Sequence, residues 1–171
     1  MPEPATETEK RAVCVGRARS FLGKPYYWGA EGPDAFDCSG LLRNCLTAVG
    51  VYPFPGDAGA HDYWAKLERV SWAERKPGDI VCYGEHQEDN QGCHHVMFVS
   101  SIPEESHEDG HQIGACRGGP PNTGESEKAY KARMAARGAS VIEVSDWYWK
   151  SARLGVVRVK WQVGAEAIAN G

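Results

Sequence analysis

The chain has 171 residues, of which 42% are hydrophobic and 25% charged, as in globular proteins that bury one hydrophobic core. Its formal net charge of −4 gives no electrostatic basis for non-specific nucleic-acid binding, so we expect no nucleic-acid partner. The sequence has no run of about 18 apolar residues and therefore predicts no membrane span. We expect a single domain over residues 1–171.

Helical patterns come first along the chain. Apolar residues recur at helical spacing over residues 6–22, where Thr6 followed three residues later by glutamate resembles a capping box. A loop rich in glycine, proline and aromatic residues follows over residues 26–37. A second helix is expected over residues 38–49 and a short third one over residues 60–67.

Strand patterns dominate the remainder. The sequence predicts strands over residues 79–83, 95–101, 112–116 and 155–161, and a helix over residues 126–137. Helices first and antiparallel strands after them are typical of an α+β domain.

The six cysteines form no CxxC pair, and the chain is long enough to fold without disulfides. We expect five of them to be reduced, apolar side chains. A zinc site made from Cys82, Cys93, His94 and His95 is the alternative, but adjacent ligands fit poorly around a tetrahedral ion. We therefore expect neither a metal nor a cofactor.

Cys38 is the candidate nucleophile. It lies in the segment FDCSG, where the glycine-rich loop enters the second predicted helix. Free N–H groups and the macrodipole at a helix N-terminus favour a thiolate, so we expect a lowered pKa for Cys38. Cys45 falls on the apolar face of the same helix, where burial should raise the pKa and keep the thiol inert.

His95 is the candidate general base, because it opens the strongest predicted strand and is thereby held rigidly. Alternation along a strand places it on the face of Met97 and Val99, with His94 on the opposite side. The alternative is a purely structural strand histidine.

Three segments together resemble the signature blocks of the NlpC/P60 cysteine peptidases, in the same order and at similar separation: PYYWGAEGPDAFDCSGLL (25–42), KPGDIVCY (76–83) and HHVMFVS (94–100). The resemblance covers roughly residues 8–118. It implies a papain-like fold with N-terminal helices packed on a central antiparallel sheet. It also implies hydrolysis of amide bonds in peptidoglycan stem peptides, often next to D-glutamate.

The resemblance also implies roles for individual residues. Cys38 matches the nucleophile and His95 the general base of the family. Asp37 and Ser39 match the residues that help to hold the free amino group of the substrate, and Asp37 is also a good N-cap for the helix. Tyr26 matches the tyrosine whose hydroxyl lies near the nucleophile, with the Cys38 backbone N–H as a second oxyanion donor.

The third polar residue of the family, which orients the base, falls on Gly114 when the strands are aligned, and glycine has no side chain. Gln112 lies two residues earlier on the same strand face, so we expect it to take this role, with His111 as an alternative.

Two aromatic features remain. Trp28 is expected either to form a wall of the groove or to lie in the core. The cluster DWYW (146–149) is expected to pack in the core or a loop rather than to stack on a sugar.

Two other functions fit the same scaffold: a cell-wall-binding or structural module such as a phage tail component, and an acyltransferase or esterase. The first residues are acidic and lack an apolar core, which does not fit a Sec-type signal peptide. We expect synthesis in the cytoplasm and action on the cell wall after phage lysis, within a virion or through a dedicated secretion device. The bond that is cleaved and the oligomeric state stay open.

Overall fold

The computed structural model describes residues 3, 5–84, 92–103 and 109–162. Its α-helices are α1 (Glu7–Ser20), α2 (Cys38–Ala48), α3 (Ala60–Lys66) and α4 (Glu127–Ala136). Its strands are β1 (Glu68–Val70), β2 (Ile80–Gly84), β3 (Cys93–Ser101), β4 (His111–Cys116), β5 (Ser140–Ser145) and β6 (Arg153–Arg158). They form one antiparallel sheet in the order β1-β6-β2-β3-β4-β5. None of the helices described is long and apolar enough to cross a membrane.

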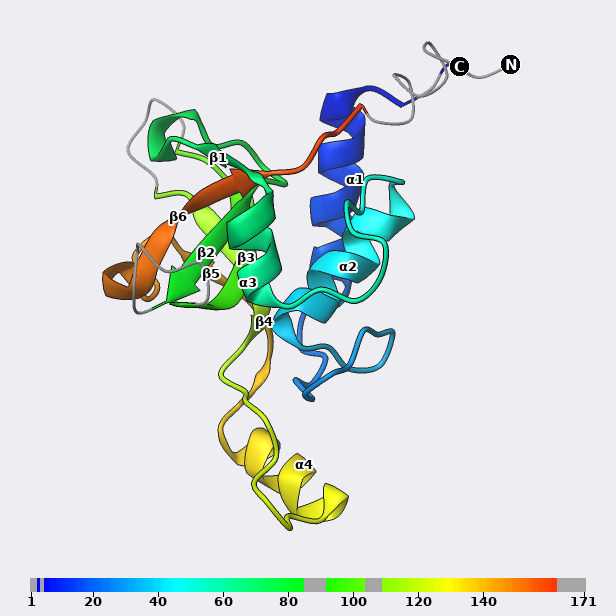
Figure 1. Cartoon of the computed structure of the whole chain (residues 1–171), viewed down its shortest axis with the longest axis vertical. Coiled ribbons are helices and arrows are strands. Elements are labelled where there is room, and N and C mark those ends of the chain that lie inside the picture. The colour runs from blue at the N-terminus through cyan, green and yellow to red at the C-terminus, as the bar shows by residue number, and fades with distance from the viewer. Residues whose placement is uncertain (1–2, 4, 85–91, 104–108, 163–171) are drawn as a thin grey trace.

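Helices α1 and α2 lie side by side against one face of the sheet (Figure 1). The expected capping box is present at α1, where the Glu9 backbone N–H donates to Thr6 Oγ1 over 3.2 Å and the Glu9 carboxylate accepts from the Thr6 N–H. In α2, Leu41, Leu42 and Leu46 are fully buried, as is Cys45 on the predicted apolar face. Both helices therefore begin and pack as the sequence predicts.

The central strands bury side chains on both faces. Along β3, Val96 and Phe98 belong to the core shared with the helices, whereas Met97 and Val99 pack in a second cluster on the opposite face. Phe98 lies opposite Ile80 of β2 and Ile113 of β4, at the centre of the sheet. The face of the sheet on which a β3 side chain lies therefore determines which groups it can contact.

Three elements differ from the prediction. Strands β1 and β5 were not predicted, because β1 has only three residues and β5 is a half-buried edge strand without clear alternation. The last predicted strand ends at Arg158 rather than at residue 161. Trp161 is instead buried beside the turn at Gly78, with the Arg11 guanidinium 4.7 Å from its ring centre.

Asp79, at the turn before β2, holds three parts of the fold together. Its carboxylate is fully buried and accepts from Arg11 of α1 over 2.9 Å and from Arg158 of β6 over 2.7 Å. It also accepts the backbone N–H of Lys76 over 2.8 Å. The Pro-Gly-Asp turn therefore has a structural role, and its carboxylate links α1 to the sheet.

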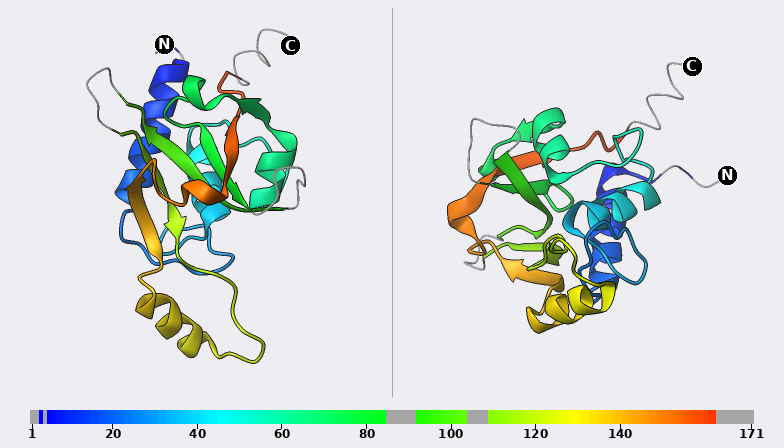
Figure 2. Two further views of the ribbon diagram at one scale, coloured as in Figure 1. Left: turned by 90° about the vertical axis from the view of Figure 1, so that its left-hand side faces the viewer. Right: turned by 60° about the horizontal axis from the view of Figure 1, so that its bottom comes forward.

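The segment between β4 and β5 extends beyond the end of the sheet and has α4 near its tip (Figure 2). Tyr130 of α4 links the helix to two neighbouring loops. Its hydroxyl accepts the backbone N–H of Trp28 over 2.8 Å and donates to the carbonyl of Gly119 over 2.7 Å. Helix α4 therefore holds the loops of Trp28 and Gly119 in place, and both loops border a cavity.

Candidate active site

Cys38 is the first residue of α2. Asp37 is its N-cap and accepts the Gly40 backbone N–H over 2.7 Å. A Cβ at Gly40 would collide with the carbonyl oxygen of Ala30, so only glycine lets the preceding loop pack this closely on the helix. The Cys38 side chain is 8% exposed, and its sulfur accepts from the backbone N–H groups of Val96 and Ser39. The nucleophile candidate thus lies against β3, next to His95.

The pKa of Cys38 differs from the expectation. Burial, and after it the charge of Asp37, raise it to about 12, although the two backbone N–H donors lower it. Burial also raises the pKa of Cys45 to about 12. The prediction of a lowered pKa for Cys38 was wrong, because loss of solvation outweighs the effect of the helix N-terminus. The thiol is protonated at neutral pH.

His95 packs against two mutually stacked aromatic rings at the beginning of β3. Its imidazole centre lies 5.6 Å from that of Tyr83 and 6.0 Å from that of Trp149. Its Nε2 lies 3.5 Å from the sulfur of Cys116; within the described residues the imidazole has no hydrogen bond to Cys38. Burial lowers the pKa of His95 to about 4, so the imidazole is neutral at pH 7.

A bulge modifies β3 at the two histidines. Tyr83 lies opposite His95 but the next residue, Gly84, lies opposite Cys93, which leaves His94 as the extra residue. As a result, strict alternation does not separate the two histidines. Both border the same cavity, although His94 is exposed and His95 is half-buried.

Two cavities meet at Cys38. The first has a volume of about 610 Å³ and the second of about 330 Å³. Tyr26, Trp28, Cys38 and His94 line both. His95 and Arg117 line the first cavity, whereas Asp37 and Ser39 line the second. The sulfur therefore lies between two spaces of different chemistry.

The remaining predicted binding residues lie at this junction. Tyr26 is 4% exposed, and burial together with the nearby Cys38 and Asp37 raises its pKa, so its hydroxyl keeps its proton. Gly118 is required here, since a Cβ would collide with the Tyr26 ring. Trp28 is 58% exposed and forms a wall, one of the two placements expected for it.

Gln112 lines neither cavity and has no hydrogen bond to the His95 imidazole among the described residues. It is fully buried, accepts from the Tyr83 hydroxyl and donates to Asp146 over 3.2 Å. Among the described residues, the His95 imidazole has Cys116 rather than Gln112 or His111 as its hydrogen-bond partner. At Gly114, where the alignment puts the third residue, a side chain would lie 2.7 Å from Met97. Gln112 therefore supports His95 only through the ring of Tyr83.

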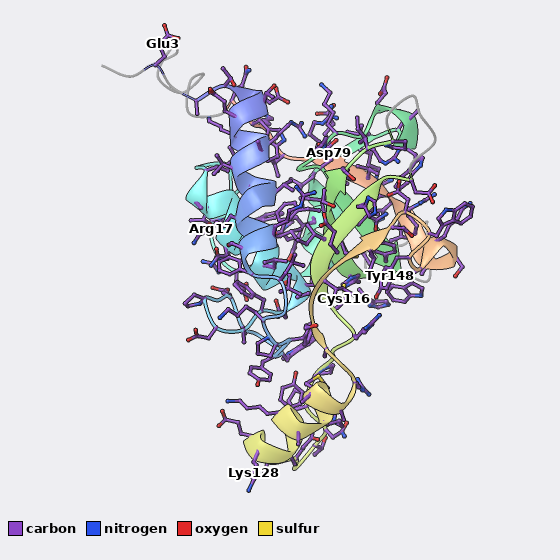
Figure 3. The ribbon with its side chains drawn as sticks, turned by 180° about the vertical axis from the view of Figure 1, so that it is seen from behind. Glu3, Arg17, Asp79, Cys116, Lys128 and Tyr148 are labelled. Carbon is purple, nitrogen blue, oxygen red and sulfur yellow. The ribbon has the colours of Figure 1, made fainter. Side chains whose placement is uncertain are left out.

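The contribution of the later residues to the first cavity was not predicted from the sequence. Tyr148, Trp149 and Arg117 line it, and Figure 3 shows Tyr148 beside Cys116 where the α4 segment leaves the sheet. The aromatic cluster lies in the turn after β5, where Tyr148 packs against the second core cluster, whereas Trp147 is 63% and Trp149 48% exposed. The left-handed backbone of Trp149 was not apparent from the sequence.

A buried cysteine at the start of a helix, packed on an antiparallel sheet with a histidine at the start of a central strand, defines a papain-like α+β domain. Residues 23–158 match the NlpC/P60 family, and the chain belongs to that family. The fold class and the family resemblance expected from the sequence are both confirmed.

Three similar proteins illustrate this relationship. The chain is 37% identical over 71 residues to the probable endopeptidase p60 of Listeria innocua, a match covering 42% of this chain and 15% of that protein. It is 38% identical over 83 residues to the gamma-DL-glutamyl hydrolase of Bacillus subtilis, covering 47% and 19%. The NlpC/p60 domain of the peptidoglycan hydrolase SagA has the same fold, with a TM-score of 0.59 at 23% identity over 86% of this chain and 97% of that one. The matched segment is thus a small part of both curated relatives.

Proposed function

We propose that this protein is a cysteine hydrolase that cleaves amide bonds in peptidoglycan stem peptides, with Cys38 as nucleophile and His95 as general base. The main support is that both residues line one cavity at the meeting point of α2 and β3. Family membership and the names of the similar endopeptidase and glutamyl hydrolase support the same chemistry.

The two groups start as a neutral pair. His95 accepts the thiol proton as the sulfur of Cys38 attacks the carbonyl carbon of the substrate, and then donates that proton to the leaving amine. A thioester remains on Cys38, and water hydrolyses it. The attack on the substrate requires the His95 imidazole to come within hydrogen-bonding distance of the Cys38 sulfur when substrate binds. Hydrogen bonds between catalytic groups are often long in the free enzyme.

The developing oxyanion has two candidate donors. The backbone N–H of Cys38 belongs to the first turn of α2, where no intrahelical acceptor is available. The Tyr26 hydroxyl borders both cavities and stays protonated, because burial raises its pKa. Both donors lie beside the nucleophile, where charge develops in the transition state.

Asp37 and Ser39 give the second cavity its role. Asp37 accepts from Gly29 and Gly40 and from the Ser39 hydroxyl, and so keeps its position while it caps α2. Its negative charge borders the second cavity and suits a substrate amino group. The N-cap role and the amine-binding role proposed here are therefore compatible.

Digestion of purified stem peptides, followed by mass spectrometry, tests the proposal. We expect fragments whose masses correspond to addition of one water across one peptide amide, and none with the Cys38→Ala protein. Retention of the protein on cell wall without any new fragment would contradict it and favour a binding module.

The pH dependence of kcat/KM reports the free base. Because burial lowers the pKa of His95 to about 4, we expect the acidic limb near pH 4, with activity lost as His95 is protonated below it. Protonation of this buried imidazole also destabilises the fold, so circular dichroism must accompany each rate. A limb near pH 6.5 would contradict His95 as the base.

A further inference from the structure

Arg117 is the first residue after β4 and borders the first cavity. Its backbone is left-handed, with φ of 68°, a conformation that is strained for residues with a side chain and that glycine adopts freely. The next two residues are glycines, yet this position holds an arginine. Strained backbone of this kind is concentrated at functional sites, where the side chain has to point in one direction.

The charge of Arg117 is unpaired within the described part of the chain, where no ion pair or hydrogen bond to its guanidinium is present. By contrast, Arg19 and Arg133 each form an ion pair at 2.8–2.9 Å. Burial raises the pKa of Cys116 and of Tyr148 to about 12, and the charge of Arg117 opposes this rise in both. Its positive charge therefore acts on the interior of the first cavity.

The proposed mechanism determines which end of the substrate each of the two cavities holds. The group that protonates the leaving amine must lie on the leaving-group side, and His95 lines only the first cavity. Asp37 and Ser39 line only the second, which suits the free amino group at the other end of the substrate. The leaving-group residue therefore lies in the first cavity, with Arg117.

We propose that Arg117 is a specificity-determining residue that binds a carboxylate of the leaving-group residue. A guanidinium pairs with a carboxylate through two parallel N–H···O bonds, and the exposed rings of Trp28 and Trp149 flank the same cavity. The carboxylate is either the free C-terminus of that residue or the second carboxylate of a diamino dicarboxylic acid. The assignment to the leaving-group side rests on the proposed function.

Three synthetic peptides of the form L-Ala-γ-D-Glu-X distinguish the two possible carboxylates. X is lysine amide, which has no carboxylate; lysine with a free C-terminus; or meso-diaminopimelate amidated at its main-chain carboxyl, which keeps only the distal carboxylate. Affinities are measured by calorimetry in a Cys38→Ala background, which leaves the peptides intact. Values of kcat/KM are measured with Cys38 present.

In the Arg117→Gln protein we expect affinity and kcat/KM to fall about 10- to 100-fold for one or both carboxylate peptides, and to change less than about 3-fold for lysine amide. Arg117→Lys keeps the charge without the planar fork and should recover part of the loss. Lys128→Gln is the charge-matched control, because Lys128 is exposed and lies at the far end of α4 (Figure 3).

An equal loss on all three peptides, or no loss on any, would overturn the assignment of Arg117. Carboxylate-dependent binding that Arg117→Gln abolishes, without cleavage when Cys38 is present, would support Arg117 as a carboxylate site while refuting the hydrolase proposal. The two ideas can therefore fail separately.

Discussion

Replacing Cys38 with alanine is expected to lower kcat/KM for stem-peptide hydrolysis by about 10⁴-fold or more, because it removes the atom that forms the thioester. The fold should persist. Cys38 is an 8% exposed residue in the first turn of α2, where alanine is accommodated and the Asp37 cap is retained. Chromatographic assay of peptide cleavage, with far-ultraviolet circular dichroism on the same samples, measures both effects.

Cys45→Ala is the matched control on the same helix. Cys45 is fully buried and also has a pKa raised to about 12, but it borders neither cavity. Its loss should leave kcat/KM within about 3-fold and lower the unfolding free energy more than Cys38→Ala does, since it leaves a cavity in the core. Comparable losses of activity in the two variants would refute Cys38 as nucleophile.

Asp79→Asn is expected to destabilise the protein by about 3 kcal/mol, because it removes the buried countercharge of the Arg11 guanidinium and leaves only the pair with the more exposed Glu7 at 3.0 Å. The Arg11 side chain is 6% exposed and that of Asp79 is fully buried, so water does not replace the lost interaction. Figure 3 shows Asp79 at the other end of the sheet from Cys116, so hydrolysis by the folded protein should be unchanged. Urea titration gives the free energy of unfolding.

The control for this substitution is Glu127→Gln, which makes the same change from carboxylate to amide on the exposed face of α4. Glu127 pairs with Lys131 at 2.9 Å, one turn along the helix, and its side chain is 82% exposed. Surface pairs of this kind contribute little to stability, so its unfolding transition should stay in place. If both substitutions lowered the free energy of unfolding by equally small amounts, the contacts of Asp79 with Arg11 and Arg158 would not be what links α1 to the sheet.

The elements that bear Cys38 and His95 could be predicted from the sequence because their determinants are local. Thr6 and Asp37 cap their helices through side chains within three residues, and the apolar pattern of β3 is continuous. The pKa of Cys38 could not be predicted, because it depends on burial against β3, which is distant along the chain. The free N–H groups and the macrodipole at the start of α2, taken alone, predict a lowered pKa for Cys38.

The surroundings of His95 could not be predicted from the sequence for a similar reason. The bulge opposite Tyr83 and the collision of any side chain at Gly114 with Met97 arise from strand register, which no single segment specifies. Trp149 and Arg117 approach the same cavity from segments outside the three family-like blocks, and both have left-handed backbone. These residues become recognisable only once the sheet is assembled.

The neutral state of Cys38 has a further chemical consequence. Peroxides and disulfides react with thiolates far faster than with thiols, so a sulfur that keeps its proton at neutral pH is poorly susceptible to oxidation. In the proposed mechanism, its nucleophilicity is expressed only when a bound peptide brings the imidazole to it. The same burial that disfavours ionisation would then protect the proposed nucleophile from oxidation between turnovers.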